Sequence, residues 1–246
     1  MRTIIVIPAR YKSSRFPGKP LAKILGKPMI QWVSELSAKA VGIENVYVAT
    51  DDNHIAETVC SLGYQVVMTS NNCLTGTDRL AEVSKKVAAD IYINVQGDEP
   101  LIHPEDIHRI IEAKKIHPNE VINAYSIITK DEDPESINIP KVIFTEDERL
   151  IYISRKALPG FKGKINIPNE YYKQVCIYAF SRQELIDFKA YGKKSILEES
   201  EDIEIIRFLE WGQIIRVVKT RPGSLAVDVP SDVIDVEQAL RRLGYR

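Results

Sequence analysis

Cysteine is scarce in this chain, with three residues in 246, Cys60, Cys73 and Cys176. They lie far apart, and no Cys-x-x-Cys or mixed Cys/His spacing accompanies them. Such a set predicts neither a disulfide framework nor a zinc site. We expect three free thiols in a reducing compartment.

A long apolar run and an excess of charge of one sign are also absent. The sequence has no stretch of about 20 apolar residues and no basic start followed by an apolar segment. We therefore expect a cytoplasmic protein without a membrane span. Lys and Arg total 33 and Asp and Glu 34, a formal net charge of −1. This balance excludes a general electrostatic attraction to nucleic acid or anionic membranes, so an anionic ligand requires a local basic cluster.

The first half of the chain alternates between two patterns. Short β-branched apolar runs, such as TIIVI and IYINV, are typical of strands buried on both faces of a sheet. Between these runs, apolar residues recur at helical spacing. The expected strands are 3–7, 45–49, 64–68 and 91–95, and the expected helices are 28–40, 55–62, 78–88 and 104–115. Repeated β–α–β units predict an α/β three-layer sandwich with a mostly parallel central sheet.

The second half of the chain has a different character. Its strand candidates, at 121–128, 142–144, 150–154 and 174–180, have only loops between them. They predict a mixed, β-rich subdomain within 121–215. Two further helices are expected over 201–211 and 230–243. Because no linker, repeat or low-complexity tract interrupts the chain, we interpret 1–246 as a single domain.

Four cations occupy the loop after the first expected strand. In a parallel sheet, loops at the carboxyl ends of strands form the ligand crevice. Two serines and a glycine in this loop let main-chain N–H groups approach an anion. The cations are Arg10, Lys12, Arg15 and Lys19, the serines are Ser13 and Ser14, and the glycine is Gly18. In a nearly neutral chain this cluster predicts a polyphosphate ligand, and the alternative is a solvated basic turn.

Two common phosphate-binding motifs are absent from the sequence. No Gly-x-Gly-x-x-Gly follows the first expected strand, and Gly26 and Lys27 precede Pro28 rather than Ser or Thr. The sequence therefore supports neither a dinucleotide-binding fingerprint nor a Walker loop. We expect side-chain cations to hold most of the phosphate charge.

Two aspartates are candidates for a metal site. Asp98 follows the fourth expected strand, within QGDEP, and Asp228 follows a short apolar run near the end of the chain. Both positions suit ligands that hold Mg²⁺ against triphosphate oxygens. For Asp228 the alternative is a helix cap, with Pro230 in the first turn. Glu99 is interpreted as a residue that either supports Asp98 or is exposed.

The stretch IPARYKSSRFPGKPLAKILGKPMI resembles the opening of 3-deoxy-manno-octulosonate (Kdo) cytidylyltransferases. The motifs VATDD, TGTDRLAE, INVQGDEP, YISR and AVDVP follow in that family's order, so the resemblance covers nearly the whole chain. It implies a nucleotide-diphospho-sugar transferase-like fold, a homodimer, and a requirement for CTP and Mg²⁺. It also implies transfer of CMP from CTP to Kdo with release of pyrophosphate, for lipopolysaccharide or capsule synthesis.

The resemblance further implies roles for individual residues. Arg10 and Lys19 would act on the phosphates during catalysis, and Asp98 and Asp228 would hold magnesium. The implied nucleotide-binding residues are Pro8, Ala9, Arg10, Ser13, Ser14, Arg15, Lys19, Thr77, Asp78 and Arg79. The implied sugar-binding residues are Gln96, Arg155, Gln174, Tyr178 and Glu204.

Departures from the family pattern lie on the sugar side. The family's histidine and glycine in H-x-G-I-Y are Gln174 and Cys176 here, and the glutamine of L-E-Q-L-R is Ile205, which predicts an apolar surface in the sugar pocket. One alternative is therefore the same chemistry on another acid, such as amino-Kdo, a nine-carbon ulosonate or a phosphonate. A second alternative is a non-catalytic nucleotide-binding protein. The two retained aspartates of the expected metal site speak against the second, because a sensor needs no such site.

Overall fold

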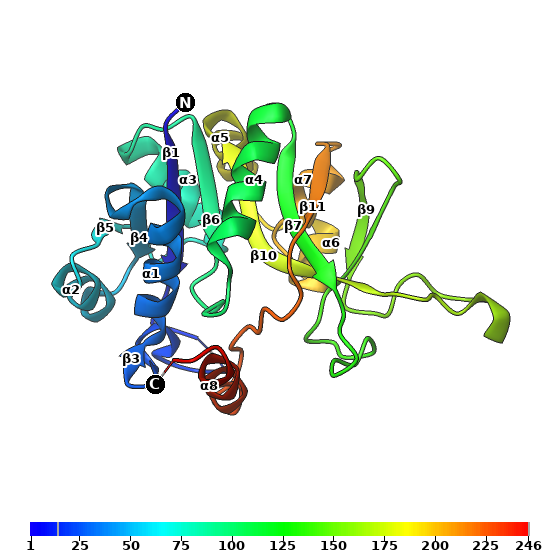
Figure 1. Ribbon diagram of the computed structural model, residues 1–246. Coiled ribbons are helices and arrows are strands. Elements are labelled where there is room, and N and C mark those ends of the chain that lie inside the picture. The colour runs from blue at the N-terminus through cyan, green and yellow to red at the C-terminus, as the bar shows by residue number, and fades with distance from the viewer. Residues whose placement is uncertain (14, 246) are drawn as a thin grey trace.

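The computed structural model describes residues 1–13 and 15–245. Its strands are β1 (Thr3–Ala9), β2 (Lys23–Ile24), β3 (Lys27–Pro28), β4 (Val46–Thr50), β5 (Gln65–Met68), β6 (Ile91–Val95), β7 (Val121–Ile127), β8 (Lys141–Phe144), β9 (Leu150–Ser154), β10 (Tyr172–Ser181) and β11 (Ile215–Lys219). All but the β2–β3 ribbon form one nine-stranded sheet, in the order β11-β7-β10-β6-β1-β4-β5, with β8 paired to β10 and β9 paired to β8 (Figure 1). Strands β1, β4, β5 and β6 pair in parallel, whereas β10 runs antiparallel to β6 and β7.

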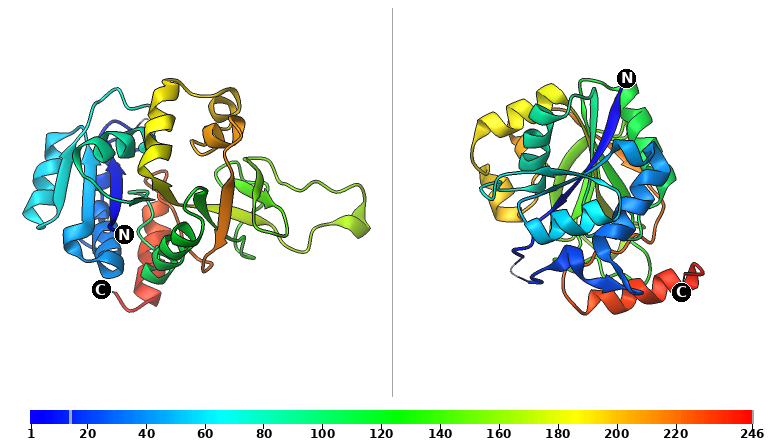
Figure 2. Two further views of the ribbon diagram at one scale, coloured as in Figure 1. Left: turned by 90° about the horizontal axis from the view of Figure 1, so that it is seen from above. Right: turned by 90° about the vertical axis from the view of Figure 1, so that its left-hand side faces the viewer.

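Helices cover both faces of this sheet (Figure 2). They are α1 (Met29–Val41), α2 (Asn53–Ser61), α3 (Gly76–Lys86), α4 (Pro104–Ile116), α5 (Arg182–Tyr191), α6 (Ile196–Glu201), α7 (Ile206–Glu210) and α8 (Asp232–Arg242). Since successive strand residues point to opposite faces, Ile5 packs with α1, α2 and α4, whereas Ile4 packs with α3, α5 and α7. Across 1–13 and 15–245, no helix combines the length and the apolar character that a membrane crossing requires.

The expected α/β architecture is confirmed, and so are the strands and helices of the first half. Two boundaries differ in ways that matter for the site. Strand β1 continues to Ala9, so Pro8 and Ala9 lie at its carboxyl end. Helix α3 begins at Gly76, because Thr75 and Asp78 form a capping box that pairs each side chain with the main-chain N–H of the other.

The single helix expected over 201–211 is wrong. Helix α6 ends at Glu201, Asp202 takes a left-handed conformation with φ of 51°, and α7 begins at Ile206. The main-chain carbonyls of Glu201 and Asp202 accept hydrogen bonds from the Arg155 guanidinium, at 2.6 Å and 3.3 Å. This long-range contact satisfies carbonyls that a continuing helix would use internally. Helix α5 and strand β11 were not predicted at all.

The strands of segment 121–215 are not separate from the main sheet. β7, β10 and β11 lie within it, and β8 joins β10 through the pairing of Lys141 with Lys173. The chain between β9 and β10 projects away from the sheet, as the yellow-green arm in Figure 1 shows. Three apolar side chains of this arm are open to solvent: Phe161 and Ile167 are each 50% exposed, and Ile165 is 96% exposed.

Candidate active site

The loop after β1 folds back on itself at the carboxyl end of the sheet. The N–H groups of Ser13 and Gly18 both donate to the carbonyl of Tyr11, at 3.1 Å and 2.9 Å. Gly18 has a φ of 70°, a left-handed conformation that glycine adopts without steric cost. The chain then enters a short 3-10 helix at Lys19, which turns the Lys19 side chain toward the loops after β6 and β11.

Lys19 joins three segments that are remote in sequence. Its Nζ donates to Oδ2 of Asp98 at 2.7 Å and to the carbonyl of Val227 at 2.9 Å. The N–H of Val227 in turn donates to the carbonyl of Asp98 at 2.9 Å. The next residue, Asp228, forms an ion pair with Arg15 at 2.9 Å. The structure therefore places both candidate metal ligands beside the basic loop.

Two glycines allow this close packing. A Cβ on Gly97 would lie 3.0 Å from the carbonyl oxygen of Pro8, so a larger residue would push the QGD turn away from β1. A Cβ on Gly76 would lie 2.9 Å from Nε2 of Gln96 and 3.1 Å from Cγ of Pro8. The end of β1, the turn after β6 and the start of α3 thus form one tightly packed corner.

The helix-cap alternative for Asp228 is wrong. Helix α8 begins at Asp232, with Ser231 as the preceding cap residue. It is Oδ2 of Asp232 that accepts the N–H groups of Asp228 and Val229, at 2.7 Å and 2.9 Å. The Asp228 carboxylate is therefore available to the basic loop, and its side chain is 29% exposed.

A polar network joins the neighbouring sugar-side candidates. Glu204 accepts the N–H of Thr77 at 2.9 Å through Oε2 and the amide of Gln96 at 3.0 Å through Oε1. Burial raises the pKa of Glu204 and, well above its ordinary value, the pKa of Tyr178. The nearby Cys176 and the negative charge of Glu204 raise the pKa of Tyr178 further. Gln96 and Glu204, both half-buried, thus form one cluster with the buried Tyr178 next to Asp98.

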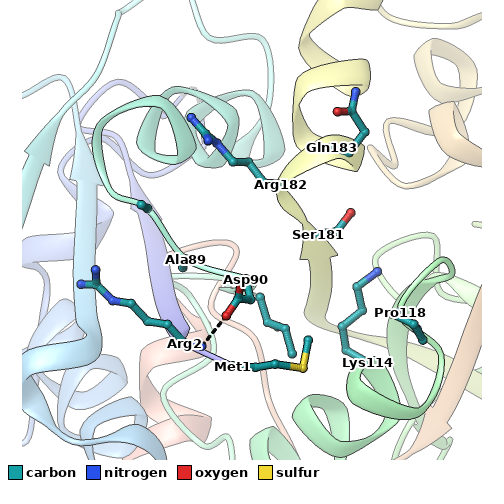
Figure 3. Close-up of a pocket in the computed structure, with 11 residues that line it drawn as sticks. Met1, Arg2, Ala89, Asp90, Lys114, Pro118, Ser181, Arg182 and Gln183 are labelled. Atoms are coloured by element: carbon teal, nitrogen blue, oxygen red, sulfur yellow. Dashed lines mark hydrogen bonds between the residues drawn. The ribbon is translucent and has the colours of Figure 1, made fainter.

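A cavity of about 720 Å³ lies at the other end of the sheet. Figure 3 shows it around Met1, Arg2 and Asp90, near the starts of β1 and β6, with Ser181 and Lys114 on its far side. The main-chain N–H of Arg2 donates to Asp90 there, at 2.7 Å. None of the candidate site residues lines this cavity, so the active-site assignment rests on the loops at the carboxyl ends of the strands.

The comparisons with known proteins agree with this geometry. A family model described as cytidylyltransferase matches residues 4–215. The chain belongs to the cytidylyltransferase family. A 3-deoxy-manno-octulosonate cytidylyltransferase of Geobacter metallireducens is 43% identical over 252 residues, covering 98% of this chain and 99% of the relative. An 8-amino-3,8-dideoxy-manno-octulosonate cytidylyltransferase of Shewanella oneidensis is 40% identical over 246 residues, with the same two coverages.

Solved structures of nucleotidyltransferases also resemble this chain. A CMP:2-keto-3-deoxy-manno-octonic acid synthetase complexed with CTP has a TM-score of 0.89 and 36% identity, covering 99% of this chain and all of that one. An inositol-1-phosphate CTP transferase from T. maritima has a TM-score of 0.69 at 16% identity, over 99% of this chain and 96% of that one, and shows the shared fold alone. The predicted fold class, enzyme class and family are therefore confirmed.

The residues expected beside the cytidine are buried in this cytidylyltransferase. Thr77, Asp78 and Arg79 are 1%, 3% and 4% exposed. Asp78 caps α3, and the Arg79 guanidinium binds Asp51 at 3.0 Å and the hydroxyl of Thr69 at 2.7 Å. Arg79 therefore ties α3 to the ends of β4 and β5, and direct contact of these residues with the nucleotide stays a prediction.

Arg155 and Gln174 are also engaged within the chain. Besides its bonds after α6, Arg155 donates to the carbonyl of Ile137 at 2.8 Å. The Gln174 amide donates to Oδ1 of Asn123 at 3.2 Å. The apolar pocket surface expected of Ile205 is wrong, because Ile205 is 1% exposed and packs in the core with α7. Sugar binding by Arg155 and Gln174 stays a prediction.

Glu99, next to Asp98, is buried, with 4% of its surface exposed. It accepts hydrogen bonds from the Ser224 hydroxyl and, at 3.4 Å, from the N–H of Cys176. The sequence reasoning missed Ser224, which carries no motif. Asp51 was also missed as a site residue, although VATDD at the end of a strand marked its position. Ser14, expected to bind phosphate, lies outside the described residues.

The donor set of Asp98 and Asp228 fits a magnesium ion held together with a nucleotide. The two carboxylates are carried by segments that the Val227–Asp98 bond joins, and their side chains are 27% and 29% exposed. Among the described residues, no group of three or more His, Cys, Asp or Glu side chains could enclose a metal. Mg²⁺ is commonly held by one or two carboxylates plus substrate phosphates, which is the arrangement available here.

Proposed function

We propose that this cytidylyltransferase transfers CMP from CTP to the anomeric hydroxyl of Kdo and releases pyrophosphate. The observation that carries the proposal is the Lys19 bridge, which brings a four-cation loop against Asp98 and the segment of Asp228. A polyphosphate and a divalent cation are the ligands whose charges this arrangement complements. The relative at 43% identity supports Kdo as the sugar.

The basic loop would bind the triphosphate of CTP and orient it for in-line attack. A new bond forms between the anomeric oxygen and the α-phosphorus, while the bond from the α-phosphorus to the oxygen of the leaving pyrophosphate breaks. The proton of the anomeric hydroxyl passes to solvent. Arg10 and Lys19 would stabilise the charge that grows on the phosphate oxygens. Main-chain groups at Pro8 and Ala9, at the end of β1, would read the cytosine together with the start of α3.

Asp98 and Asp228 would hold the magnesium ion. When bound, Mg²⁺ neutralises phosphate charge and lowers the pKa of a coordinated hydroxyl. The chain's own contribution is to hold the two carboxylates at adjacent positions and to supply cations that compensate them before the nucleotide binds. Lys19 and Arg15 make these compensating ion pairs.

The sugar would bind beside Gln96, Tyr178 and Glu204, with Arg155 facing its carboxylate. Three contacts hold the Arg155 guanidinium on main-chain carbonyls, and an arginine carries further N–H donors for an anionic ligand. Asp202 lies close enough to Arg155 and Arg10 that both lower its pKa, after the larger effect of its bond with Lys194. The sugar-side arginine and the phosphate loop thus approach the same residue.

A second candidate substrate is the 8-amino analogue of Kdo, which the 40% identical Shewanella relative supports. We further propose a homodimer, formed through the exposed apolar arm between β9 and β10, and a cytoplasmic place of action, where CTP is supplied. The activated sugar would serve lipopolysaccharide or capsule synthesis.

Pyrophosphate release from CTP, measured with Kdo, with 8-amino-Kdo and without sugar, tests the proposal. We expect release that depends on both the sugar and Mg²⁺, with the higher kcat/KM for Kdo. A higher kcat/KM for the amino sugar would favour the second candidate. Nucleotide binding without release in the presence of any acid would instead support a non-catalytic protein.

A further inference from the structure

The segment that carries Asp228 is packed unevenly: Val227 is fully buried in an apolar cluster with Met29 and Trp32, whereas 221–223 are exposed. Residues 220–231, all of which the structure describes, contain no helix or strand. A cavity of about 330 Å³ lies under 220–224, between this segment and the side chains of Ile102, Val175 and Leu243. Because apolar packing is incomplete under 220–224, the position of this part of the segment depends on its polar contacts.

Glu99 makes the side-chain contact that anchors this segment to the turn after β6. Its Oε2 accepts the hydroxyl of Ser224, and its Oε1 accepts the N–H of Cys176 on β10. The carbonyl of Ser224 also accepts Nζ of Lys173, at 3.2 Å. Glu99 directly follows Asp98, and Ser224 precedes Asp228 by four residues. One buried carboxylate therefore links the two short stretches that carry the metal-site aspartates.

We propose that Glu99 is a positioning residue that sets the relative placement of Asp98 and Asp228 through its bond with Ser224. The inference rests on the proposed magnesium site. It gives Glu99, which the sequence suggested as a support of Asp98, a specific partner on the segment of Asp228. The N–H of Val227 and the Lys19 side chain also join the two stretches, through the Asp98 carbonyl and carboxylate. Lys19 is expected to change partner when a triphosphate binds, and the Glu99–Ser224 bond then remains as the side-chain link.

The physical expectation is a loss of divalent-cation affinity when this link is removed. Carboxylates that must be drawn together on binding give weaker sites than carboxylates held in place beforehand. Residues that support metal ligands in this way typically contribute about tenfold to a hundredfold to affinity when they are replaced. Neither Glu99 nor Ser224 needs to touch the metal or the nucleotide for this effect.

The test titrates Mn²⁺, as a detectable substitute for Mg²⁺, into the full-length protein saturated with α,β-methylene-CTP. Electron paramagnetic resonance of free Mn²⁺ gives the dissociation constant. We expect Glu99→Ala and Ser224→Ala each to weaken Mn²⁺ about tenfold or more. The double variant should bind no more weakly than the weaker single variant, because both changes remove the same bond.

A conservative variant and a control variant distinguish loss of the Glu99–Ser224 bond from general disruption of the fold. Glu99→Gln should stay within about threefold of the native protein, because an amide can accept from Cys176 and donate to the Ser224 hydroxyl. Glu105→Ala, at an exposed acidic position after the same turn, should leave Mn²⁺ affinity unchanged. If Glu99→Ala does not fold, Ser224→Ala tests the proposal by itself, because Ser224 is a half-buried loop residue.

Asp98→Asn distinguishes failure of this inference from failure of the proposed function. Unchanged Mn²⁺ affinity in Asp98→Asn would remove the metal-site assignment on which the inference rests. Weakened affinity in Asp98→Asn, together with native affinity in Ser224→Ala, would overturn the positioning role alone. Additive losses in the double variant would do the same, since they would show that Glu99 and Ser224 act separately.

Discussion

Lys19 and Asp98 form an ion pair of 2.7 Å, although they are 79 residues apart in the chain. Both side chains are partly buried, at 16% and 27% exposure, so solvent screens their attraction less than at an open surface. Arg15 and Asp228 form the parallel pair at 2.9 Å. Two cations of the phosphate loop therefore compensate the two carboxylates of the metal site. When triphosphate and metal bind, each cation can exchange its carboxylate for phosphate oxygens.

Replacing Lys19 with methionine should affect the two ligands in opposite directions. We expect Lys19→Met to lower kcat/KM for CTP on the order of a hundredfold, because one cation at the reacting phosphates is lost. Without nucleotide, the variant should bind Mn²⁺ more tightly than the native protein, because Asp98 loses a competing cation. Steady-state kinetics and Mn²⁺ titration measure the two effects.

Lys23→Met is the matched control, because Lys23 is an exposed lysine of β2 just beyond the same loop. It should change neither quantity. Weaker Mn²⁺ binding in nucleotide-free Lys19→Met would contradict the exchange of partners, since Lys19 would then support the metal site rather than compete for it.

Asp98→Asn and Asp228→Asn should each lower kcat on the order of a hundredfold or more, because each removes a charge that holds magnesium. They should disturb folding little, since both side chains lie in loops and are partly exposed. Asp232→Ala should, by contrast, lower the stability of the fold. It removes the carboxylate that accepts two N–H groups before α8, at a cost of about 0.5–2 kcal/mol in the free energy of unfolding.

Denaturant unfolding and pyrophosphate release distinguish these variants. A destabilised Asp228→Asn variant with near-native kcat would restore a capping role for Asp228. A stable variant with low kcat supports its role at the metal.

The arm between β9 and β10 should hold the proposed dimer together. Ile165→Asp places a charge at the most exposed apolar position of the arm, and it should shift the protein from dimer to monomer in sedimentation velocity. Ile43→Asp is the control, because Ile43 is 47% exposed after α1, remote in sequence from the arm. A native protein that sediments as a monomer, or an Ile165→Asp variant that stays dimeric, would contradict this role of the arm.

Local patterns predicted much of the fold and two parts of the candidate site. The β-branched runs of β1, β4 and β6 and the helical spacing between them are short-range signals, and sheet topology then brings their loops together. The basic loop and Asp98 could be found in this way, because each follows a predicted strand. That Lys19 contacts Asp98 follows from the order β6-β1 in the sheet, which the alternation alone does not specify.

The unpredicted features depend on contacts that are distant in the chain. Glu99 was interpreted without a partner because Ser224 lies 125 residues away. The break at Asp202 follows from Arg155, which takes carbonyls that a continuous helix would use. Strand β11, with the sequence IRVVK, mixes charges with apolar residues, and its pairing with β7 decides its conformation. Secondary-structure preference alone does not contain such information.

Gln174 lies on the sugar side of the candidate site, at the position where the family pattern has histidine. Gln174 is 7% exposed, and its amide donates to Asn123. A histidine near a sugar carboxylate can become cationic and donate a charge-assisted hydrogen bond, whereas an amide donates a neutral one. The difference is about 1 kcal/mol or slightly more, up to about tenfold in kcat/KM. We expect Kdo to give the highest kcat/KM among related acids, and Gln174→His to use Kdo equally well or better.

The measurement is kcat/KM for Kdo, 8-amino-Kdo and a nine-carbon ulosonate in the native protein and in Gln174→His. Gln183→His, at an exposed glutamine of α5, controls for the added imidazole and should leave all three values unchanged. If another acid reacts at least about tenfold faster than Kdo, and Gln174→His reduces that preference, then position 174 contributes to selection of a different sugar. The Kdo assignment would then fall. Transfer of CMP from CTP would still stand, because the loop of Lys19 and the carboxylates of Asp98 and Asp228 do not depend on which acid is bound.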